Sequence, residues 1–420
     1  MIRTTYYQDL TKMNTFGMKV KARCFMEYDS VADLVDIEFE ELARPVLHIG
    51  GGSNLLFTDD FKGTILHSKI NFIEILDECH SDRDSHCHFD RAERVEKSSE
   101  PVLVSVGAGV VFDDFCDWAA KEGLWGVENL SYIPGEVGAS AVQNIGAYGV
   151  EVKDVIRKVY CYDTVEEEFV NFDVEDCEYG YRDSIFKDPE VKGRYIVTHV
   201  VFALSRTPNP KLEYGHLREA VMSVYGECQC VPETPSQASL GPSPYPGVGK
   251  CPLHTTGISP NSESEDCHFE RSVSEDEKSL NVALTPAQIR KAIIKIRKEK
   301  LPEPSVKGSA GSFFKNPVIS VEHFSKIESA AKAELGADYK VPHYDLPDGT
   351  VKVPAAWMIE QCGWKGKRSG GAAVWDKQPL VIVNHTGEAY PEEIIGLEKR
   401  IISSVKSKFG IELHPEVEHV

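Results

Sequence analysis

The residues best suited to chemistry begin in two glycine-rich segments that could hold an anion. The first, Gly50-Gly51-Gly52-Ser53-Asn54-Leu55-Leu56, follows residues 45–49, an apolar run that indicates a buried strand. Its glycines let backbone N–H groups approach an anion closely, and Ser53 and Asn54 add side-chain donors. A lone glycine triplet is more often only a tight turn. A second segment of the same kind, at residues 133–149, strengthens the functional interpretation.

This second segment is also rich in small residues and polar donors. It contains Ile133-Pro134-Gly135, then Gly138, then the run Gln143-Asn144-Ile145-Gly146-Ala147-Tyr148-Gly149. Together the two segments could hold a pyrophosphate between them. Neither opens a helix with G-x-G-x-x-G, so the Rossmann dinucleotide fingerprint is not the pattern here.

A third motif, at residues 308–317, combines small residues with a hydroxyl. Ser312 precedes two aromatic residues that could exclude water from a ligand. Asn316 is held extended by the proline that follows it, so its amide could point into a cleft. The alternative is an ordinary Gly/Ser turn before a strand.

Charged and aromatic residues gather at three further places. Tyr181 and Arg182 precede Asp183, and arginine suits bidentate recognition of a carboxylate, although Arg182 and Asp183 could simply be a surface pair. Tyr214 offers a hydroxyl beside a flexible glycine. Glu416 lies near Glu412, His414 and Glu418 in the last expected strand, where a solvated acidic face is the simple account.

Composition limits the class of protein. The chain has 420 residues, enough for two or three domains, and 41% of them are hydrophobic, as in soluble globular proteins. A net charge of −20 argues against nucleic acid or an anionic membrane as a partner. No run of 18 apolar residues occurs, and the N-terminal residues lack the apolar core of a signal peptide.

Two polar stretches, 77–100 and 227–281, have the composition of disordered inserts. They share the tripeptide Cys-His-Phe, starting at Cys87 and Cys267, whose cysteine and histidine could be metal ligands. Zinc sites need closer, ordered ligand spacing, so we expect tolerated surface inserts and no metal. The chain has 11 cysteines, and those outside the inserts are scattered singly, as expected for reduced thiols.

Between the inserts, strands and helices alternate in an α+β pattern. Strands are expected at 46–49, 102–106, 155–162 and 195–204, and helices from Val31 after the cap Ser30 and over 111–120. Thr285 and Gln288 form a capping box for a helix that ends before Pro302 and places Arg297 and Lys300 beside the next loop. Further helices are expected around 217–224 and 392–408, the latter before a closing strand over 411–420.

Taken together, these motifs resemble the UDP-N-acetylenolpyruvoylglucosamine reductase family over nearly the whole chain except the inserts. Tyr214, in a Leu-Glu-Tyr-Gly setting, resembles the type I form, which folds a tyrosine loop over its substrate. The markers are Asn14-Thr15-Phe16, the loop 50–56, Ile133-Pro134-Gly135, 143–149, Gly180-Tyr181-Arg182-Asp183-Ser184, 311–317 and Pro415-Glu416-Val417.

The resemblance implies an α+β fold with two FAD-binding subdomains of the vanillyl-alcohol-oxidase (PCMH) type, at 1–72 and 101–205. A smaller α+β substrate-binding domain would span 206–420. The implied reaction is reduction of UDP-N-acetylenolpyruvoylglucosamine to UDP-N-acetylmuramic acid for peptidoglycan, with non-covalent FAD and with NADPH as co-substrate. The flavin N5 would pass a hydride to the terminal CH2 carbon of the enolpyruvyl ether. We expect a cytoplasmic monomer.

The resemblance also implies roles for individual residues. Ser312 would protonate the enolate that Arg182 and Glu416 stabilise. The FAD would lie against residues 50–55, 133–135, Gly138, Gln143, Asn144, Gly146, Ala147 and Tyr148. The remaining matches are to the substrate, and they are Tyr181, Tyr214, Arg297, Lys300, Asn316 and Tyr344.

Glu418 departs from the family, which often has arginine two residues after the catalytic glutamate.

Two other classes of function stay open. A related FAD-dependent alcohol oxidase or dehydrogenase would carry a flavin-linking His or Cys near the first glycine loop, where His48 lies inside the expected strand. A non-catalytic nucleotide-sugar-binding module would bind no coloured cofactor.

Overall fold

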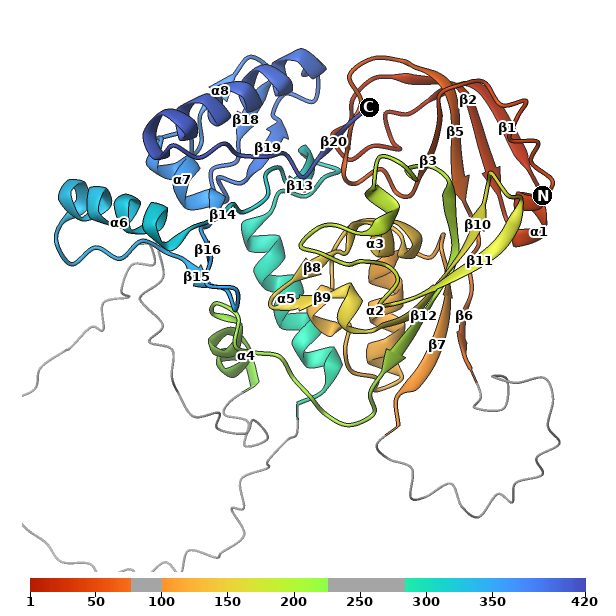
Figure 1. Ribbon diagram of the computed structural model, residues 1–420, viewed down its shortest axis with the longest axis horizontal. Coiled ribbons are helices and arrows are strands. Elements are labelled where there is room, and N and C mark those ends of the chain that lie inside the picture. The colour runs from red at the N-terminus through yellow and green to blue at the C-terminus, as the bar shows by residue number, and fades with distance from the viewer. Residues whose placement is uncertain (77–99, 226–283) are drawn as a thin grey trace, which may run out of the picture.

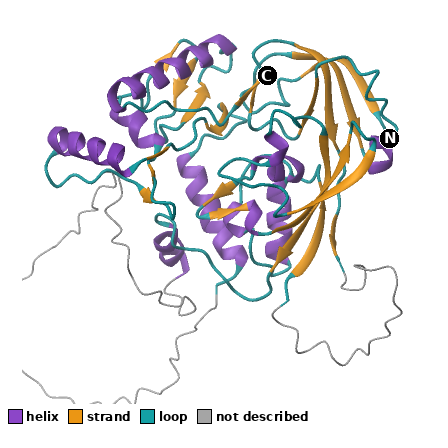
Figure 2. Cartoon of the chain, in the orientation of Figure 1, coloured by secondary structure: helices purple, strands orange, loops and turns teal. Residues whose placement is uncertain are grey.

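The computed structural model describes residues 1–76, 100–225 and 284–420 (Figure 1). Apart from Glu100, the two expected inserts at 77–100 and 227–281 lie outside the described residues, and so does the repeated Cys-His-Phe tripeptide. Strands and helices are mixed along the rest of the chain (Figure 2), as the α+β prediction requires.

The first sheet is built from the N-terminal residues and carries the first glycine loop. Its strand order is β1-β2-β5-β3, with bounds Arg3–Asp9, Lys21–Tyr28, Phe61–Ser68 and Val46–Ile49. Helix α1 (Val31–Val35) begins after Ser30, whose hydroxyl accepts from the Asp33 N–H, as predicted. The prediction that 46–49 is a buried strand was wrong in part, since β3 lies at the sheet edge and only Ile49 is buried.

The second sheet is antiparallel and follows in the chain. Its order is β11-β10-β12-β7-β6, with bounds Glu168–Asp173, Ile156–Asp163, Tyr195–Leu204, Val102–Gly107 and Ile73–Ile75. Helix α2 (Phe112–Lys121) packs on it through Phe112 and Phe115, so these aromatic side chains of the helix belong to the core. Because β6 starts at residue 73, the sheets change close to the expected boundary at 72. The division into subdomains otherwise stays a prediction.

Short elements between these strands approach the second glycine-rich segment. Helix α3 (Val137–Gln143) packs against β12 and β7. The remaining short elements are the 3-10 helices η2 (Glu128–Leu130), η3 (Val152–Asp154) and η4 (Ile185–Lys187), and the strands β8 (Gly146–Ala147) and β9 (Val150–Glu151).

Two helices flank the second gap in the described chain. Helices α4 (Leu217–Tyr225) and α5 (Pro286–Lys300) pack together through a small core that includes Leu217, Ile289 and Ile293. The predicted capping box of Thr285 and Gln288 is present at the start of α5. Helix α5 also packs on α2, where Arg290 pairs with Asp113.

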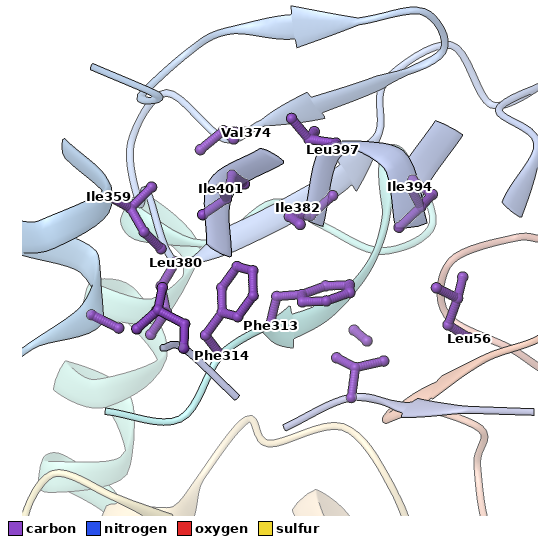
Figure 3. Close-up of a cluster of buried hydrophobic side chains, with 14 of the residues drawn as sticks. Leu56, Phe313, Phe314, Ile359, Val374, Leu380, Ile382, Ile394, Leu397 and Ile401 are labelled. Atoms are coloured by element: carbon purple, nitrogen blue, oxygen red, sulfur yellow. The ribbon is translucent and has the colours of Figure 1, made fainter. Parts of the chain in front are cut away.

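The C-terminal part surrounds a third sheet, of order β13-β19-β18-β17, with bounds Gly308–Ser312, Val381–Asn384, Ala372–Val374 and Arg368–Ser369. Helices α7 (Ala355–Gln361) and α8 (Pro391–Phe409) contribute to its core. Phe313 and Phe314 point into this core beside Leu380, Ile382 and Ile401 (Figure 3), and both are buried. The expectation that they would exclude water from a ligand was wrong, because they anchor the strand that carries Ser312.

A small outlying unit follows β13. Helix α6 (Val321–Leu335) lies next to a three-stranded sheet of order β14-β16-β15, with bounds Val318–Ile319, Val351–Lys352 and Tyr344–Asp345 (Figure 1). Tyr344 faces Lys352 across the β15–β16 pair. Among the described helices, none is long and apolar enough to cross a membrane.

The last ten residues return to the first glycine loop. The expected strand over 411–420 is only β20 (Glu418–His419), which pairs in parallel with β4 (Leu55–Leu56). Glu416 lies before this strand, and Pro415, which has no N–H, contributes only an isolated bridge to Phe314. The tail is therefore held by hydrogen bonds to two segments. One is β4, and the other is the segment after β13, where the Phe313 carbonyl accepts the Glu416 N–H at 2.8 Å.

The Asn14-Thr15-Phe16 motif joins the N-terminal and C-terminal parts. Asn14 is buried and closes its own turn by three hydrogen bonds to Leu10 and Met18. The Ser309 N–H donates to the Thr15 carbonyl at 2.8 Å. Gly308 passes so close to the Phe16 backbone that a Cβ atom would lie 2.1 Å from its carbonyl oxygen.

We therefore expect Gly308→Ala to lower the free energy of unfolding by about 2 kcal/mol, the usual cost of overpacking. Gly396→Ala is the matched control, because a Cβ atom at this helical glycine meets no atom within 4 Å. That change should raise stability by up to about 1 kcal/mol. Urea unfolding of both variants provides the measurement, and equal stabilities would show that the contact at Phe16 is not close.

Candidate active site

The two glycine-rich loops face each other directly. The Ser53 hydroxyl donates to the Pro134 carbonyl at 3.0 Å. Gly51 lies opposite Gly135, and a Cβ atom on Gly51 would be only 3.5 Å from the Gly135 Cα. Because neither glycine carries a side chain, a ligand such as the diphosphate of FAD can approach the backbone of both loops closely. These residues therefore fit the cofactor that the sequence predicts.

Two of the glycines expected to lie against the FAD, Gly52 and Gly138, are also required by the packing of the protein itself. Gly52 has φ +62, and a Cβ atom there would lie 1.9 Å from the Met13 carbonyl oxygen. A Cβ atom on Gly138 would lie 2.9 Å from that of Ala108. Asn54 faces away from the second loop, because its amide donates to the Glu416 carbonyl at 3.0 Å. It links the first loop to the C-terminal tail.

The segment that follows α3 forms the support for Arg182. Asn144 ends the helix in a left-handed conformation, and its buried amide donates to the Gly180 carbonyl at 2.7 Å. Gly146 approaches Arg182 so closely that a Cβ atom would lie 2.7 Å from Nη1. Gly146 and Ala147 pair with β9 in a two-stranded ribbon. This part of the expected flavin segment thus also positions a charged side chain.

Arg182 is the most highly connected polar residue of the site. Its Nε forms an ion pair with Glu416 Oε1 at 2.9 Å, and Nη1 donates to the Asn144 carbonyl at 3.2 Å. Nη2 binds the Gly146 carbonyl, and Glu151 lies 3.8 Å from Nη1. Arg182 does not pair with Asp183 on the surface; it lies mostly buried, with 16% of its side chain exposed.

Glu416 is brought to Arg182 from the opposite end of the chain. Only 19% of its side chain is exposed, so the solvated acidic face expected from the sequence was wrong for this residue. Burial raises the pKa of Glu416, while the charges of Arg182, Lys187 and Lys315 act to lower it. The neighbouring Glu412 does face outward, since it is exposed and pairs with Lys406.

Ser312 lies on a backbone segment adjacent to that of Glu416. It ends β13 after a bulge between Ser309 and Ser312, with Gly311 at φ +69. Such a bulge redirects the side chain that follows it. The adjoining Phe313 carbonyl accepts the Glu416 N–H, so Ser312 and Glu416 come from adjacent backbone segments. Among the described residues, none forms a hydrogen bond with the Ser312 hydroxyl, which leaves it free for a ligand.

A second group of expected residues surrounds the Tyr181 ring. The Asn316 amide lies 3.5 Å from the Tyr181 hydroxyl and accepts from the Ala355 N–H. The Lys352 amine lies 4.4 Å from the ring centroid, and burial lowers its pKa. Arg182 covers the same ring at 5.2 Å.

Three tyrosines continue the site on the side of α4 and α5. Tyr214 stacks on Tyr344 with centroids 6.0 Å apart, and Tyr148 meets Tyr214 edge to face at 6.3 Å. Arg297 reaches toward them and donates to the Tyr132 carbonyl at 3.0 Å. Burial lowers the pKa of Arg297, while Tyr148 acts in the opposite direction. Tyr214 and Tyr344 are both partly exposed, at 42% and 43%.

Lys300 is the predicted residue that the structure does not draw into these contacts. Its side chain is exposed, and within the described residues no ion pair joins it to the site. Glu418, which replaces the family's usual arginine, pairs with Lys192. That lysine therefore balances the reversed charge at this position.

Sequence reasoning missed two charged residues that lie here, Lys187 and Lys352. Lys187 contacts Arg182 and Gln143, and Lys352 covers Tyr181. A signal for Lys352 was present, because Pro347-Asp348-Gly349 is a turn sequence that pairs the flanking residues across a hairpin. Nothing local distinguishes Lys187 from the many solvated lysines of the chain.

Two family models match different parts of the chain. A family model described as the C-terminal domain of UDP-N-acetylenolpyruvoylglucosamine reductase matches residues 303–420. A second model, described as an FAD binding domain, matches residues 23–169. The first matched region contains Ser312 and Glu416, and the second contains both glycine loops.

Relatives match over almost the entire chain. The UDP-N-acetylenolpyruvoylglucosamine reductase of Bacteroides fragilis (strain YCH46) is 43% identical over 98% of each chain. That of Porphyromonas gingivalis (strain ATCC 33277) is 38% identical over 98% of this chain and 97% of its own. Among solved structures, the corresponding enzyme of Thermus caldophilus has a TM-score of 0.54 at 18% identity, covering 100% of this chain and 98% of that one.

The structural likeness and the FAD-binding model confirm the expected α+β FAD-binding fold. The relatives match 98% of this chain, so the likeness is not limited to one domain. By its sequence, this chain belongs to the UDP-N-acetylenolpyruvoylglucosamine reductase family.

Proposed function

We propose that this chain reduces UDP-N-acetylenolpyruvoylglucosamine to UDP-N-acetylmuramic acid in peptidoglycan synthesis, with FAD as cofactor and NADPH as electron donor. The observation that carries the proposal is the buried Arg182–Glu416 pair, 2.9 Å apart and next to the unpaired Ser312 hydroxyl. When bound, FAD supplies the hydride that is added to the terminal CH2 carbon of the enolpyruvyl group.

The residues of the chain then manage the charge that this addition creates. Hydride addition places negative charge on the adjacent carbon and its carboxylate. The Arg182 guanidinium stabilises that charge, and Glu416 fixes its orientation through Nε. Ser312 Oγ donates its proton to the carbon and recovers one from water. A hydroxyl is a weak acid, but an enolate carbon is basic enough for the transfer to run downhill.

The remaining residues of the site bind and orient the two ligands. The facing loops at Ser53 and Pro134 would hold the FAD diphosphate. Tyr181, Asn316 and the stacked pair Tyr214–Tyr344 would bind the sugar nucleotide, with Arg297 and Lys300 as cations for its diphosphate. The exposed Tyr214–Tyr344 pair could then close over the substrate and exclude water. The expectations of a monomer and of a cytoplasmic location stay predictions.

The competing oxidase function would need a residue that links the flavin covalently. His48, the nearest histidine to the first loop in the chain, already contacts the Tyr28 hydroxyl through Nε2 at 2.7 Å. Burial lowers its pKa to about 3. A partly buried imidazole that already has a hydrogen-bond partner favours a non-covalent cofactor.

The function itself is tested by the visible spectrum of the purified protein. We expect flavin bands that bleach when NADPH is added without oxygen and return when UDP-N-acetylenolpyruvoylglucosamine follows. A colourless protein would favour a binding module. Bands that bleach with a simple alcohol, and not with NADPH, would favour the oxidase.

Removing the proposed acid should affect one half-reaction only. We expect Ser312→Ala to leave flavin reduction by NADPH intact and to slow reoxidation by the sugar nucleotide at least about 100-fold. Ser312→Cys should keep more activity, because a thiol can still give a proton. Stopped-flow absorbance separates the two half-reactions, and near-normal turnover of the alanine variant would remove Ser312 from the mechanism.

Glu416→Gln should lower turnover by about 100-fold while FAD binding and the KM for the sugar nucleotide change little. The physical reason is that a neutral amide no longer holds the Arg182 guanidinium when charge develops in the transition state. Steady-state kinetics and flavin content provide the measurements. If the whole loss appeared in KM, Glu416 would be a binding residue.

A further inference from the structure

Lys187 contacts the backbone of Arg182 but has no role in the mechanism above. It ends the 3-10 helix η4, five residues after Arg182. Its amine donates to the Arg182 carbonyl at 2.9 Å and to Gln143 Oε1 at 3.3 Å. The contact joins the turn that carries Arg182 to the end of helix α3.

The backbone of Arg182 is in a conformation that needs such support. Its φ of +57 lies in the left-handed region, which is unfavourable for a residue with a Cβ atom. The hydrogen bonds of the turn itself join Gly180 and Asp183, at 3.1 and 3.2 Å. They leave the Arg182 carbonyl to Lys187. The neighbouring Ser184 adds a second connection to α3 by donating to the Val142 carbonyl at 2.7 Å.

The charge of Lys187 is not cancelled by a contact partner. Its two acceptors are neutral oxygen atoms, and among the described residues no carboxylate lies within ion-pair distance of its amine. Burial is the main cause that lowers the pKa of Lys187, and Lys315 adds to it. The carboxylates of Asp183, Glu416 and Glu418 act in the opposite direction. A poorly solvated cation without a paired anion is costly. Because no contact partner neutralises the Lys187 charge, it acts electrostatically on these carboxylates.

We propose that Lys187 is a positioning residue for the Arg182–Glu416 pair. It holds the Arg182 carbonyl against α3 and places a second positive charge beside Glu416. The inference rests on the proposed function, because it concerns the same half-reaction. It adds a residue whose effect passes through Arg182 and Glu416 rather than through contact with the substrate.

The first test is Lys187→Met, which keeps the length of the side chain and removes the donor and the charge. We expect normal FAD content and normal flavin reduction by NADPH. Reoxidation by the sugar nucleotide should slow about 100-fold, the effect of a small displacement of a catalytic group, with KM nearly unchanged. Lys187→Arg should recover part of the rate because it restores the charge. If Lys187→Met failed to retain flavin, Lys187→Gln would carry the same comparison.

The control is Lys192→Met, which removes a lysine from the same segment. Lys192 is more than half exposed and pairs with Glu418, so its loss should leave the reoxidation rate within about twofold. Equal losses in the Lys187 and Lys192 variants would mean that only the general charge of the segment matters, and would overturn the proposal.

A pH profile and a double variant separate positioning from simple structural support. Glu416→Gln should abolish one limb of the kcat profile, which identifies that limb as Glu416. In Lys187→Met the midpoint of this limb should move to higher pH, because removing a nearby cation disfavours the carboxylate while Arg182 and Lys315 remain.

In the Glu416→Gln background, Lys187→Met should cost much less than it does alone, because the two changes affect one unit. Multiplicative losses with an unmoved limb would overturn the inference. The proposed function would survive that result as long as the unaltered protein reduces the sugar nucleotide. If the unaltered protein does not reduce it, the proposed function fails instead.

Discussion

The ion pair between Arg182 and Glu416 is the interaction on which the rest of the site depends. It joins residues more than 200 positions apart, at 2.9 Å, and both side chains are largely withdrawn from water. Either group alone would be a buried charge, which costs about 3–5 kcal/mol when its partner is removed. The fold therefore has to deliver both partners together, and several features of the backbone follow from that requirement.

Two of these features lie at the ends of the chain. The C-terminal tail passes between the first glycine loop and β13, because Asn54 binds the Glu416 carbonyl and Phe313 accepts the Glu416 N–H. The Asn14-Thr15-Phe16 turn joins the same loop to β13 from the other side. The loops that fit a diphosphate and the strand that carries Ser312 are thus bound into one unit.

Local signals in the sequence predicted the elements well and the site only in part. Helix starts at Ser30 and Thr285 carry short-range capping information, and both were confirmed. The low exposure of Glu416 could not be predicted from the acidic residues around it, because its partner, Arg182, is distant in the sequence. The same limit applies to Phe313 and Lys187, whose surroundings are set by tertiary packing. Motifs identified the family, and the three-dimensional fold showed which charges meet.

The central claim is that Arg182 and Glu416 act as one unit in stabilising the charge formed on the substrate. It is tested by single-turnover reoxidation of the reduced flavin in Arg182→Met, in Glu416→Gln and in the double variant. The account predicts that the double variant is slowed little more than the slower single variant. Losses that multiply would contradict it, because they would show that the two side chains contribute independently.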